Sequence, residues 1–153
     1  MAKQPDIRQA TFDDCQALAP IFDQYRKFFT GKSDSAGSHA FLSDRLRRQE
    51  SVVFAAFEGE SALGFAQLYP MFSSWYVSRQ WFLSDLFVVP DSRRAGIARR
   101  LLDACAAFAR ETKARSILVE MPFSEPHLIQ LYEAVGYGPD KDFALYRLKL
   151  TGP

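Results

Sequence analysis

Apolar residues recur at two different spacings along the first third of the chain. Ile7–Ala10 is a short stretch typical of a strand. Over residues 18–29 apolar positions return every three or four residues, which predicts a helix, and residues 41–48 predict a second one. Between them, residues 31–38 are rich in Gly and Ser. We expect a mobile loop there, bordering the entrance to a binding site.

The two spacings alternate over the rest of the chain. Two strand-like runs flank Gly59-Glu60, which predicts a hairpin. We expect strands at 51–58, 61–69 and 80–89, a helix at 94–112, a strand at 116–121, a helix at 125–135 and a strand at 144–150. The last strand alternates Tyr146, Leu148 and Leu150 with Leu145, Arg147 and Lys149. This order predicts an α/β fold, a mixed sheet with helices packed on it.

Length and composition favour one folded domain over residues 1–153. An apolar content of 48% supplies a core, and a chain of this size buries about 70% of its unfolded surface. Nineteen basic residues against eighteen acidic ones argue against a nucleic-acid or anionic-membrane partner. The N-terminus lacks the apolar core of a signal peptide and no run approaches 18 apolar residues, so we expect a cytoplasmic protein.

Cysteine and histidine predict neither a disulfide framework nor a metal site. Cys15 and Cys105 are too few for a framework in a chain this long. Cys105 falls on the apolar stripe of the predicted helix at 94–112, where it reads as a small buried hydrophobe. His39 and His127 lie far apart without neighbouring cysteines, so we expect no bound metal.

Asp85 lies inside the apolar strand at 80–89. A carboxylate in a strand interior costs free energy unless it is paired or hydrogen-bonded, so its presence needs a cause. It is either a general base for an amine or a structural hydrogen-bonding group, and the sequence leaves both open. Ser84, expected on the opposite strand face, is a lesser candidate.

Aromatic residues gather between the second and third predicted strands. They are Tyr69, Phe72, Trp75 and Tyr76, with Trp81 beyond them. Such a cluster can enclose an amine by cation–π contact, or it can pack a hairpin or a dimer face. Of this cluster, Tyr69, Phe72 and Trp75 are the candidates for binding a substrate.

The segment after the strand at 80–89 has the features of a phosphate site. The strand ends at Pro90, and Arg93-Arg94-Ala95-Gly96-Ile97-Ala98 leads into a helix. Free backbone N–H groups at a helix start, flanked by arginines, suit a pyrophosphate. A Rossmann-type dinucleotide site would need second and third glycines that are missing here. The segment resembles the acetyl-CoA signature of the GNAT superfamily of N-acetyltransferases, Gln/Arg-x-x-Gly-x-Gly/Ala, as Arg93-x-x-Gly96-x-Ala98.

A second segment, Leu131-Tyr132-Glu133-Ala134-Val135-Gly136-Tyr137, resembles the GNAT motif Leu-Tyr-x-x-x-Gly-Phe/Tyr. In that motif the first tyrosine is commonly the general acid, which here would be Tyr132. A phenol can protonate the departing coenzyme A thiolate, whose pKa is roughly 8.5. The alternative is a core aromatic on an amphipathic helix. The family often has an asparagine seven residues earlier, where this chain has Glu125.

The GNAT resemblance covers nearly the whole chain. It implies a mostly antiparallel central sheet with helices on both faces, with acetyl-CoA as co-substrate and no metal. Resemblance assigns the cofactor contacts to Leu86, Phe87, Val88, Arg93, Arg94, Ala95, Gly96, Ile97, Ala98 and Arg99.

It also implies a reaction. The strand around Asp85 is similar to that of polyamine acetyltransferases, and we expect acetyl transfer to a primary amine of a small molecule. Since no cysteine lies beside an obvious base, the amine would attack directly in a ternary complex. The alternatives are a non-catalytic acyl-CoA-binding regulatory module and a protein N-acetyltransferase. A homodimer is possible.

Overall fold

The computed structural model describes residues 4–152. They form two compact units, which meet in the sequence between Glu120 and Met121. The first unit carries the sheet and three α-helices, and the second carries one α-helix.

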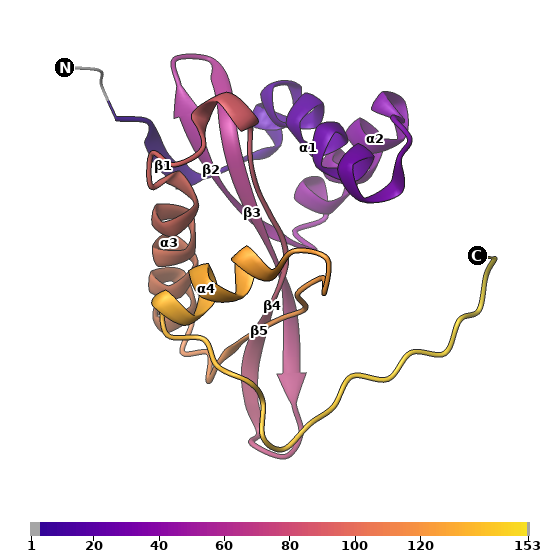
Figure 1. The fold of residues 1–153 in the computed structure, drawn as a ribbon, viewed down its shortest axis with the longest axis vertical. Helices are drawn as coiled ribbons and strands as arrows, with labels where there is room; N and C mark the ends of the chain where they lie inside the picture. The colour runs from indigo at the N-terminus through magenta and orange to yellow at the C-terminus, as the bar shows by residue number, and fades with distance from the viewer. Residues whose placement is uncertain (1–3, 153) are drawn as a thin grey trace. The chain divides into compact units, whose positions relative to one another are not determined.

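The first unit is built around a five-stranded sheet in the order β1-β2-β3-β4-β5 (Figure 1). Its strands are β1 Asp6–Gln9, β2 Val52–Glu58, β3 Ser61–Ser73, β4 Ser78–Val88 and β5 Ile117–Val119. Its helices are α1 Cys15–Thr30, α2 Ser35–Arg47 and α3 Ile97–Glu111, with short 3-10 turns at Phe12–Asp14 and Pro90–Ser92. Neighbouring strands are antiparallel except β4 and β5, which are parallel. The predicted mixed α/β sheet is confirmed.

The side chains of β2 point alternately to the two faces of the sheet, and an apolar layer covers each face. Val53, Ala55 and Phe57 join the buried cluster that includes Leu18 of α1. Phe54 faces the other way and stacks edge-on against Phe108 of α3, with 5.6 Å between ring centroids. Helices α1 and α2 therefore cover one face and α3 the other (Figure 1).

The segment between α1 and α2 differs from the expected mobile loop over 31–38. Helix α2 already begins at Ser35, because the Asp34 carboxylate accepts a hydrogen bond from the Gly37 N–H at 2.9 Å and caps the helix. The loop is thus only four residues long. Glycine and serine content alone predicts a longer loop, because it takes no account of this cap.

That short loop is also anchored. The buried Asp23 carboxylate of α1 accepts hydrogen bonds from the Ser33 hydroxyl, from the Asp34 N–H (2.8 Å) and from the Ser38 hydroxyl (2.8 Å). These hydrogen bonds hold the pKa of Asp23 below its ordinary value, and the bond from Ser33 has the largest effect. The start of α2 is therefore fixed to α1 rather than free to close over a ligand.

The second unit contains α4, Pro126–Ala134, with Pro126 in its first turn. The strand predicted at 144–150 is not formed: these residues belong to no helix or strand among those described. The alternation of apolar and polar residues is present, but a strand also needs a neighbour to pair with, and a local pattern does not supply one.

Candidate active site

A β-bulge lies in the middle of β4. Gln67 pairs with Asp85 and the next residue of β3, Leu68, pairs with Leu83, so Ser84 is an extra residue on β4. The bulge changes the direction of the side chains that follow it. Ser84 and Asp85 consequently line the same pocket, and the expectation that they face opposite sides of the strand is wrong.

This pocket, which we call the acceptor pocket, has a volume of about 440 Å³. Strands β3 and β4 contribute Tyr69, Ser84 and Asp85 to it. The remaining lining residues come from α1, α2 and the turn between them: Phe22, Tyr25, Arg26, Asp34, Gly37 and Phe41. Aromatic side chains thus form walls around the carboxylate of Asp85.

The structure brings Tyr69 into this pocket but not the other two predicted substrate-binding residues. Phe72 is 71% exposed near the end of β3, where the Arg79 guanidinium lies 4.9 Å from its ring centroid. Trp75 is 74% exposed in the turn between β3 and β4. Neither lines the acceptor pocket, because β3 runs four residues beyond the predicted end at Tyr69 and carries them away along the hairpin.

A chain of hydrogen bonds fixes the Asp85 carboxylate. The Ser51 hydroxyl donates to Gln67 Oε1 at 2.8 Å, and Gln67 Nε2 donates to Asp85 Oδ2 at 2.8 Å. Gln67 has no exposed surface and Ser51 is buried. Because the serine fixes which end of the amide faces Asp85, the carboxylate receives a donor at one oxygen in a defined orientation.

Burial dominates the ionisation of Asp85. Desolvation raises its pKa above the ordinary carboxyl value, although hydrogen bonds from Gln67, Tyr25 and Ser84 act in the opposite direction. A carboxylate whose pKa is raised holds a proton more strongly than an exposed one. Asp85 is therefore a stronger base than an ordinary carboxylate, as proton abstraction from an amine requires.

Tyr69 remains protonated beside it. Desolvation and the negative charge of Asp85 together raise the pKa of Tyr69 to about 12, against a smaller opposing effect of Arg45. At neutral pH the phenol is a neutral hydrogen-bond donor and an aromatic wall. It does not compete with Asp85 as a base.

Next to Asp85, the outer side of β4 pairs with no other strand among residues 4–152. Pairing with β5 stops at Leu83. Beyond it the Val89 N–H donates toward β3, to the Leu63 carbonyl at 2.9 Å. Since backbone groups alternate sides along an antiparallel strand, those of Leu86 and Val88 point away from β3. The Val88 carbonyl accepts from Arg93 Nε at 2.8 Å, which leaves Leu86 and the Val88 N–H facing the open edge.

The turn after β4 presents the start of α3. Gly96 precedes the helix with φ of 75° and Arg94 also has a positive φ of 63°. A Cβ at Gly96 would meet no atom within 4 Å, so the space beside this backbone is open. Together with the free N–H groups of the first helical turn, this space fits a phosphate group.

The arginines of this turn are not equivalent. Arg93 braces the turn through its bond to Val88, and its guanidinium lies 5.6 Å from the Phe87 ring centroid. Arg99 lies 4.0 Å from Asp103, one helical turn later. Arg94 and Ala95 are exposed, while Ile97 turns into the core. The predicted phosphate-binding segment is thus anchored at Arg93 and Ile97 and open between them.

In the second unit, Tyr132 lies on α4 and is buried. Its ring packs edge-on against Tyr137 with 5.2 Å between centroids, and its carbonyl accepts the Tyr137 N–H at 3.0 Å. Glu125 stands immediately before α4, and one of its carboxylate oxygens lies 3.4 Å from His127 Nδ1. The position where the family often has asparagine is thus occupied by a carboxylate engaged with a neighbouring histidine.

Known proteins agree with this architecture. Residues 18–137 match the model of the acetyltransferase (GNAT) family. The chain belongs to this family. A GNAT fold and an acyltransferase activity follow, as the resemblance of the two motifs implied.

Three relatives place the chain within the GNAT family. It is 41% identical to the "Uncharacterized N-acetyltransferase YhfO" of Bacillus subtilis, covering 95% of this chain and 97% of that one. It is 27% identical to a thialysine N-epsilon-acetyltransferase of Caenorhabditis elegans, over 88% and 84% of the two chains. The crystal structure of a probable acetyltransferase superposes with a TM-score of 0.91 at 38% identity, covering 97% and 99%.

Several residues that line the acceptor pocket were not singled out from the sequence as site residues. The helical spacing of the sequence explains Phe22, Tyr25 and Phe41 as apolar positions of predicted helices and gives no sign of the pocket. Gln67 was one polar residue in an apolar strand. The sequence contained a signal for Gln67, because an amide inside an apolar strand, like the carboxyl group of Asp85, needs hydrogen-bond partners. Only the register of β3 against β4 shows that each is the partner of the other.

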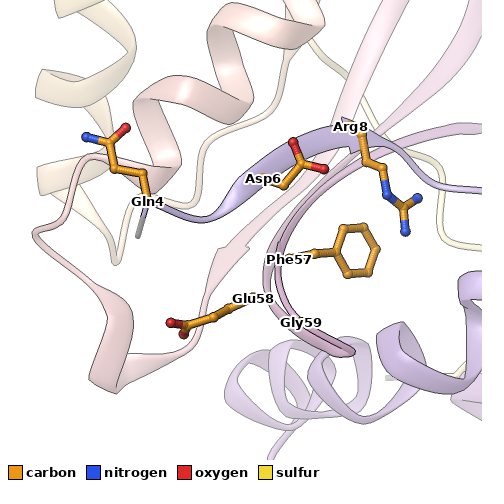
Figure 2. Close-up of a pocket in the computed structure, with 6 residues that line it drawn as sticks. All are labelled: Gln4, Asp6, Arg8, Phe57, Glu58 and Gly59. Carbon is orange, nitrogen blue, oxygen red and sulfur yellow. The ribbon is translucent and has the colours of Figure 1, made fainter. Parts of the chain in front are cut away.

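A second, smaller cavity of about 160 Å³ lies between β1 and the β2–β3 turn (Figure 2). Its cation is already neutralised: Arg8 donates to both Asp14 oxygens, at 2.8 and 2.7 Å, and lies 4.0 Å from the Phe57 ring centroid. This pairing lowers the pKa of Asp14 to about 2. The arginine of this cavity is therefore already engaged and is not available to bind an anionic group. Within residues 4–152, no helix is both long and apolar enough to cross a membrane.

Proposed function

We propose that this GNAT protein transfers an acetyl group from acetyl-CoA to the primary amine of a small molecule. One observation carries the proposal. Two consecutive residues of β4 point to two neighbouring places: the half-buried carboxylate of Asp85 lines an aromatic pocket, and the backbone of Leu86 faces an open edge. An amine held at Asp85 would therefore lie beside a thioester held along the backbone of Leu86.

The acetyl donor, acetyl-CoA, would bind along the β4 edge and at the start of α3. Leu86 and Val88 would pair with the pantetheine arm as with an added strand, and Phe87 shapes the strand between them. The N–H groups from Arg94 to Arg99 would hold the pyrophosphate around Gly96, with Ala95, Ile97 and Ala98 keeping the turn uncluttered. Bound in this way, acetyl-CoA supplies an activated acyl group.

The charge and the size of the acceptor pocket support a small amine as the acceptor. A cavity of about 440 Å³ lies within the range of small-molecule sites. Asp85 and Asp34 attract a cation, while the rings of Tyr25, Phe41 and Tyr69 suit cation–π contact. The anchored turn before α2 limits the space available to a long peptide. A relative named for acetylating thialysine, a small amine, points the same way.

The chemistry assigns one role to each polar group. A substrate ammonium has a pKa of roughly 10 and must lose a proton before its nitrogen can attack. Asp85 accepts that proton, directly or through a water molecule, while Gln67 keeps the carboxylate in place. Tyr132 donates a proton to the departing thiolate. The nitrogen attacks without a covalent enzyme intermediate.

A panel of acceptors tests this proposal. Free thiol release is measured with polyamines, amino sugars, amino-acid amines and lysine-containing or N-terminal peptides. We expect at least one small amine to exceed every peptide in kcat/KM by about tenfold or more, a difference of roughly 1.4 kcal/mol in transition-state binding. Peptides that surpass every small amine by that factor indicate a protein acetyltransferase. Acetyl-CoA binding with no turnover of any acceptor indicates a regulatory module.

Gly96→Glu tests the phosphate site separately. The new carboxylate enters the open space beside the turn and repels the pyrophosphate, so we expect the affinity for acetyl-CoA to fall by about tenfold or more. Gly59→Glu is the matched control, because Gly59 also has a positive φ, 60°, and open space around its Cβ. Both variants carry the same backbone strain. Calorimetry that finds equal affinity for the two variants rules out this phosphate site.

A further inference from the structure

The acceptor pocket has charged side chains in two separate layers of the first unit. One is Asp85 on the sheet, where Gln67 of β3 donates to it. The others come from the helices: Arg26 belongs to α1, and Asp34 caps the start of α2. The proposed acetyl transfer gives no role to the guanidinium of Arg26. An acceptor that fills the pocket would therefore meet a second set of charges away from its reacting amine.

The protein itself engages only part of the Arg26 guanidinium. Its Nη1 donates to the Ser38 hydroxyl at 3.1 Å and lies 3.8 Å from Asp23 Oδ1. The same Asp23 oxygen accepts from the Asp34 N–H at 2.8 Å, so Arg26 lies close to Asp34. Among residues 4–152, Nε and Nη2 of Arg26 have no hydrogen-bond partner. These donors form a planar fork that matches the two oxygens of a carboxylate.

Aromatic rings line the space between the helices and the sheet. Tyr25 precedes Arg26 on α1, yet its hydroxyl donates to the Ser84 carbonyl of β4 at 3.5 Å. The rings of Phe22 and Phe41, which also line the pocket, stack with 6.0 Å between centroids. Such walls suit a short methylene chain, which buries apolar surface and needs no hydrogen bonds.

We propose that the acceptor is a diamino acid, an amino acid with a second primary amine at the end of its side chain. This inference rests on the proposed acetyl transfer and narrows its acceptor. The carboxylate of the substrate pairs with Arg26 and its α-ammonium with Asp34, while the side-chain amine lies at Asp85. Two carboxylates and one guanidinium in the pocket thus complement two ammonium groups and one carboxylate in the substrate.

This orientation determines which nitrogen reacts. The side-chain ammonium gives one proton to Asp85, and the free amine attacks the acetyl carbon. A carbon–nitrogen bond forms, the bond from that carbon to sulfur breaks, and the nitrogen loses its second proton as the amide forms. Coenzyme A leaves as the thiol. The product is an amino acid that is acetylated at its side-chain amine and keeps its α-amine.

A diamine without a carboxylate is a poorer match for the same pocket. Its second ammonium can pair with Asp34, but it then lies close to the positive charge of Arg26. The donors of the guanidinium also remain without a partner. A site that is built to hydrogen-bond one substrate group discriminates against an analogue that lacks the group. Arg26 is therefore expected to determine specificity rather than to take part in the chemistry.

Paired acceptors test the role of the carboxylate. Lysine and cadaverine differ only in this group, as do ornithine and putrescine. We expect the parent to prefer at least one diamino acid over its diamine by about tenfold or more in kcat/KM, measured by thiol release. Fragment-ion mass spectrometry should find the acetyl group on the side-chain nitrogen. Diamines that are used as well as both diamino acids, or acetylation at the α-nitrogen, would overturn the proposal.

Arg26→Gln tests the guanidinium, and Lys27→Gln is its control. Lys27 is exposed on the same helix and does not line the pocket, so the control makes the same change of charge. Arg26→Gln should lower kcat/KM for the preferred diamino acid by about tenfold or more and leave its diamine within about twofold. Lys27→Gln should leave both acceptors unchanged. Arg26→Lys, which keeps the charge but loses the fork, should fall between. A loss that is equal for both acceptors would show that Arg26 only supports the fold.

Binding measurements keep this inference apart from the proposed function. If no acceptor releases thiol, acetyl transfer is wrong, and calorimetric affinities of the parent and Arg26→Gln for lysine, ornithine and their diamines still test the site. The parent should bind one diamino acid more tightly than its diamine, and Arg26→Gln should remove that difference. If diamines and diamino acids are acetylated equally well, acetyl transfer holds and the diamino-acid site is wrong. Equal affinities for both members of each pair would contradict the site in the same way.

Discussion

Asp85→Asn is expected to lower kcat/KM by about 10²–10⁴-fold, the usual cost of removing a general base. The same substitution should raise the free energy of unfolding at neutral pH. Asn keeps the shape of the side chain and its Oδ1 can still accept from Gln67 Nε2, but the half-buried, desolvated charge disappears. Activity and stability should thus change in opposite directions.

The pH dependence of this gain follows from the raised pKa of Asp85. A carboxyl group whose pKa is higher in the folded state than in the unfolded state destabilises the fold when it is ionised. That cost is complete above the folded-state pKa and vanishes below the unfolded value of about 3.9. The stability advantage of Asp85→Asn should therefore be greatest at neutral pH and decline as the pH falls toward 4.

Two measurements separate this role from a structural one. Thermal or urea unfolding at several pH values gives the stability, and kcat/KM against pH gives the activity, whose loss should be partly relieved at high pH where free amine is abundant. Asp13→Asn, at an exposed carboxylate, is the control and should leave both unchanged. A fall in stability with an activity profile of unchanged shape would show that Asp85 only holds the structure together.

The sequence was most informative where the local pattern agrees with the final packing. The hairpin β2–β3 was found from its turn and its alternation. Helix α3 was found from its apolar stripe, although it begins at Ile97 rather than near Arg94. That difference arises because Gly96 and Arg94 adopt positive φ and hold the turn open. The motif thus predicted the position of a helix start after β4 but overextended the helix by about three residues.

The acceptor pocket was much less predictable, because it depends on register. The single-residue bulge at Ser84 aligns Gln67 with Asp85, and nothing in the local order of residues specifies it. The rings of Phe22 and Phe41 reach the pocket from two helices whose apolar residues look like ordinary core positions. The aromatic run after Tyr69 was conspicuous in the sequence but lies along the hairpin. The aromatic pattern therefore predicted two substrate-binding residues, Phe72 and Trp75, that lie outside the pocket.

Tyr132→Phe is the second substitution with a large expected effect. It should lower kcat by about 10²–10⁴-fold, as expected for loss of a general acid. The thiolate would then leave without a proton. The affinity for acetyl-CoA should remain unchanged, because the ring keeps its shape and its edge-on packing against Tyr137. Tyr132 should thus affect turnover and not binding.

The experiment combines steady-state kinetics, calorimetric binding of acetyl-CoA and a melting curve on the same preparation. Tyr146→Phe is the matched control: it removes a hydroxyl from a tyrosine of the same unit that is almost fully exposed, and its kcat should equal that of the parent. An unchanged kcat in Tyr132→Phe, or a fall in melting temperature large enough to account for the lost activity, would identify Tyr132 as a core aromatic of α4. Retained stability with a kcat lowered a hundredfold or more would instead require the phenolic proton in the reaction, because the hydroxyl is all that the substitution removes.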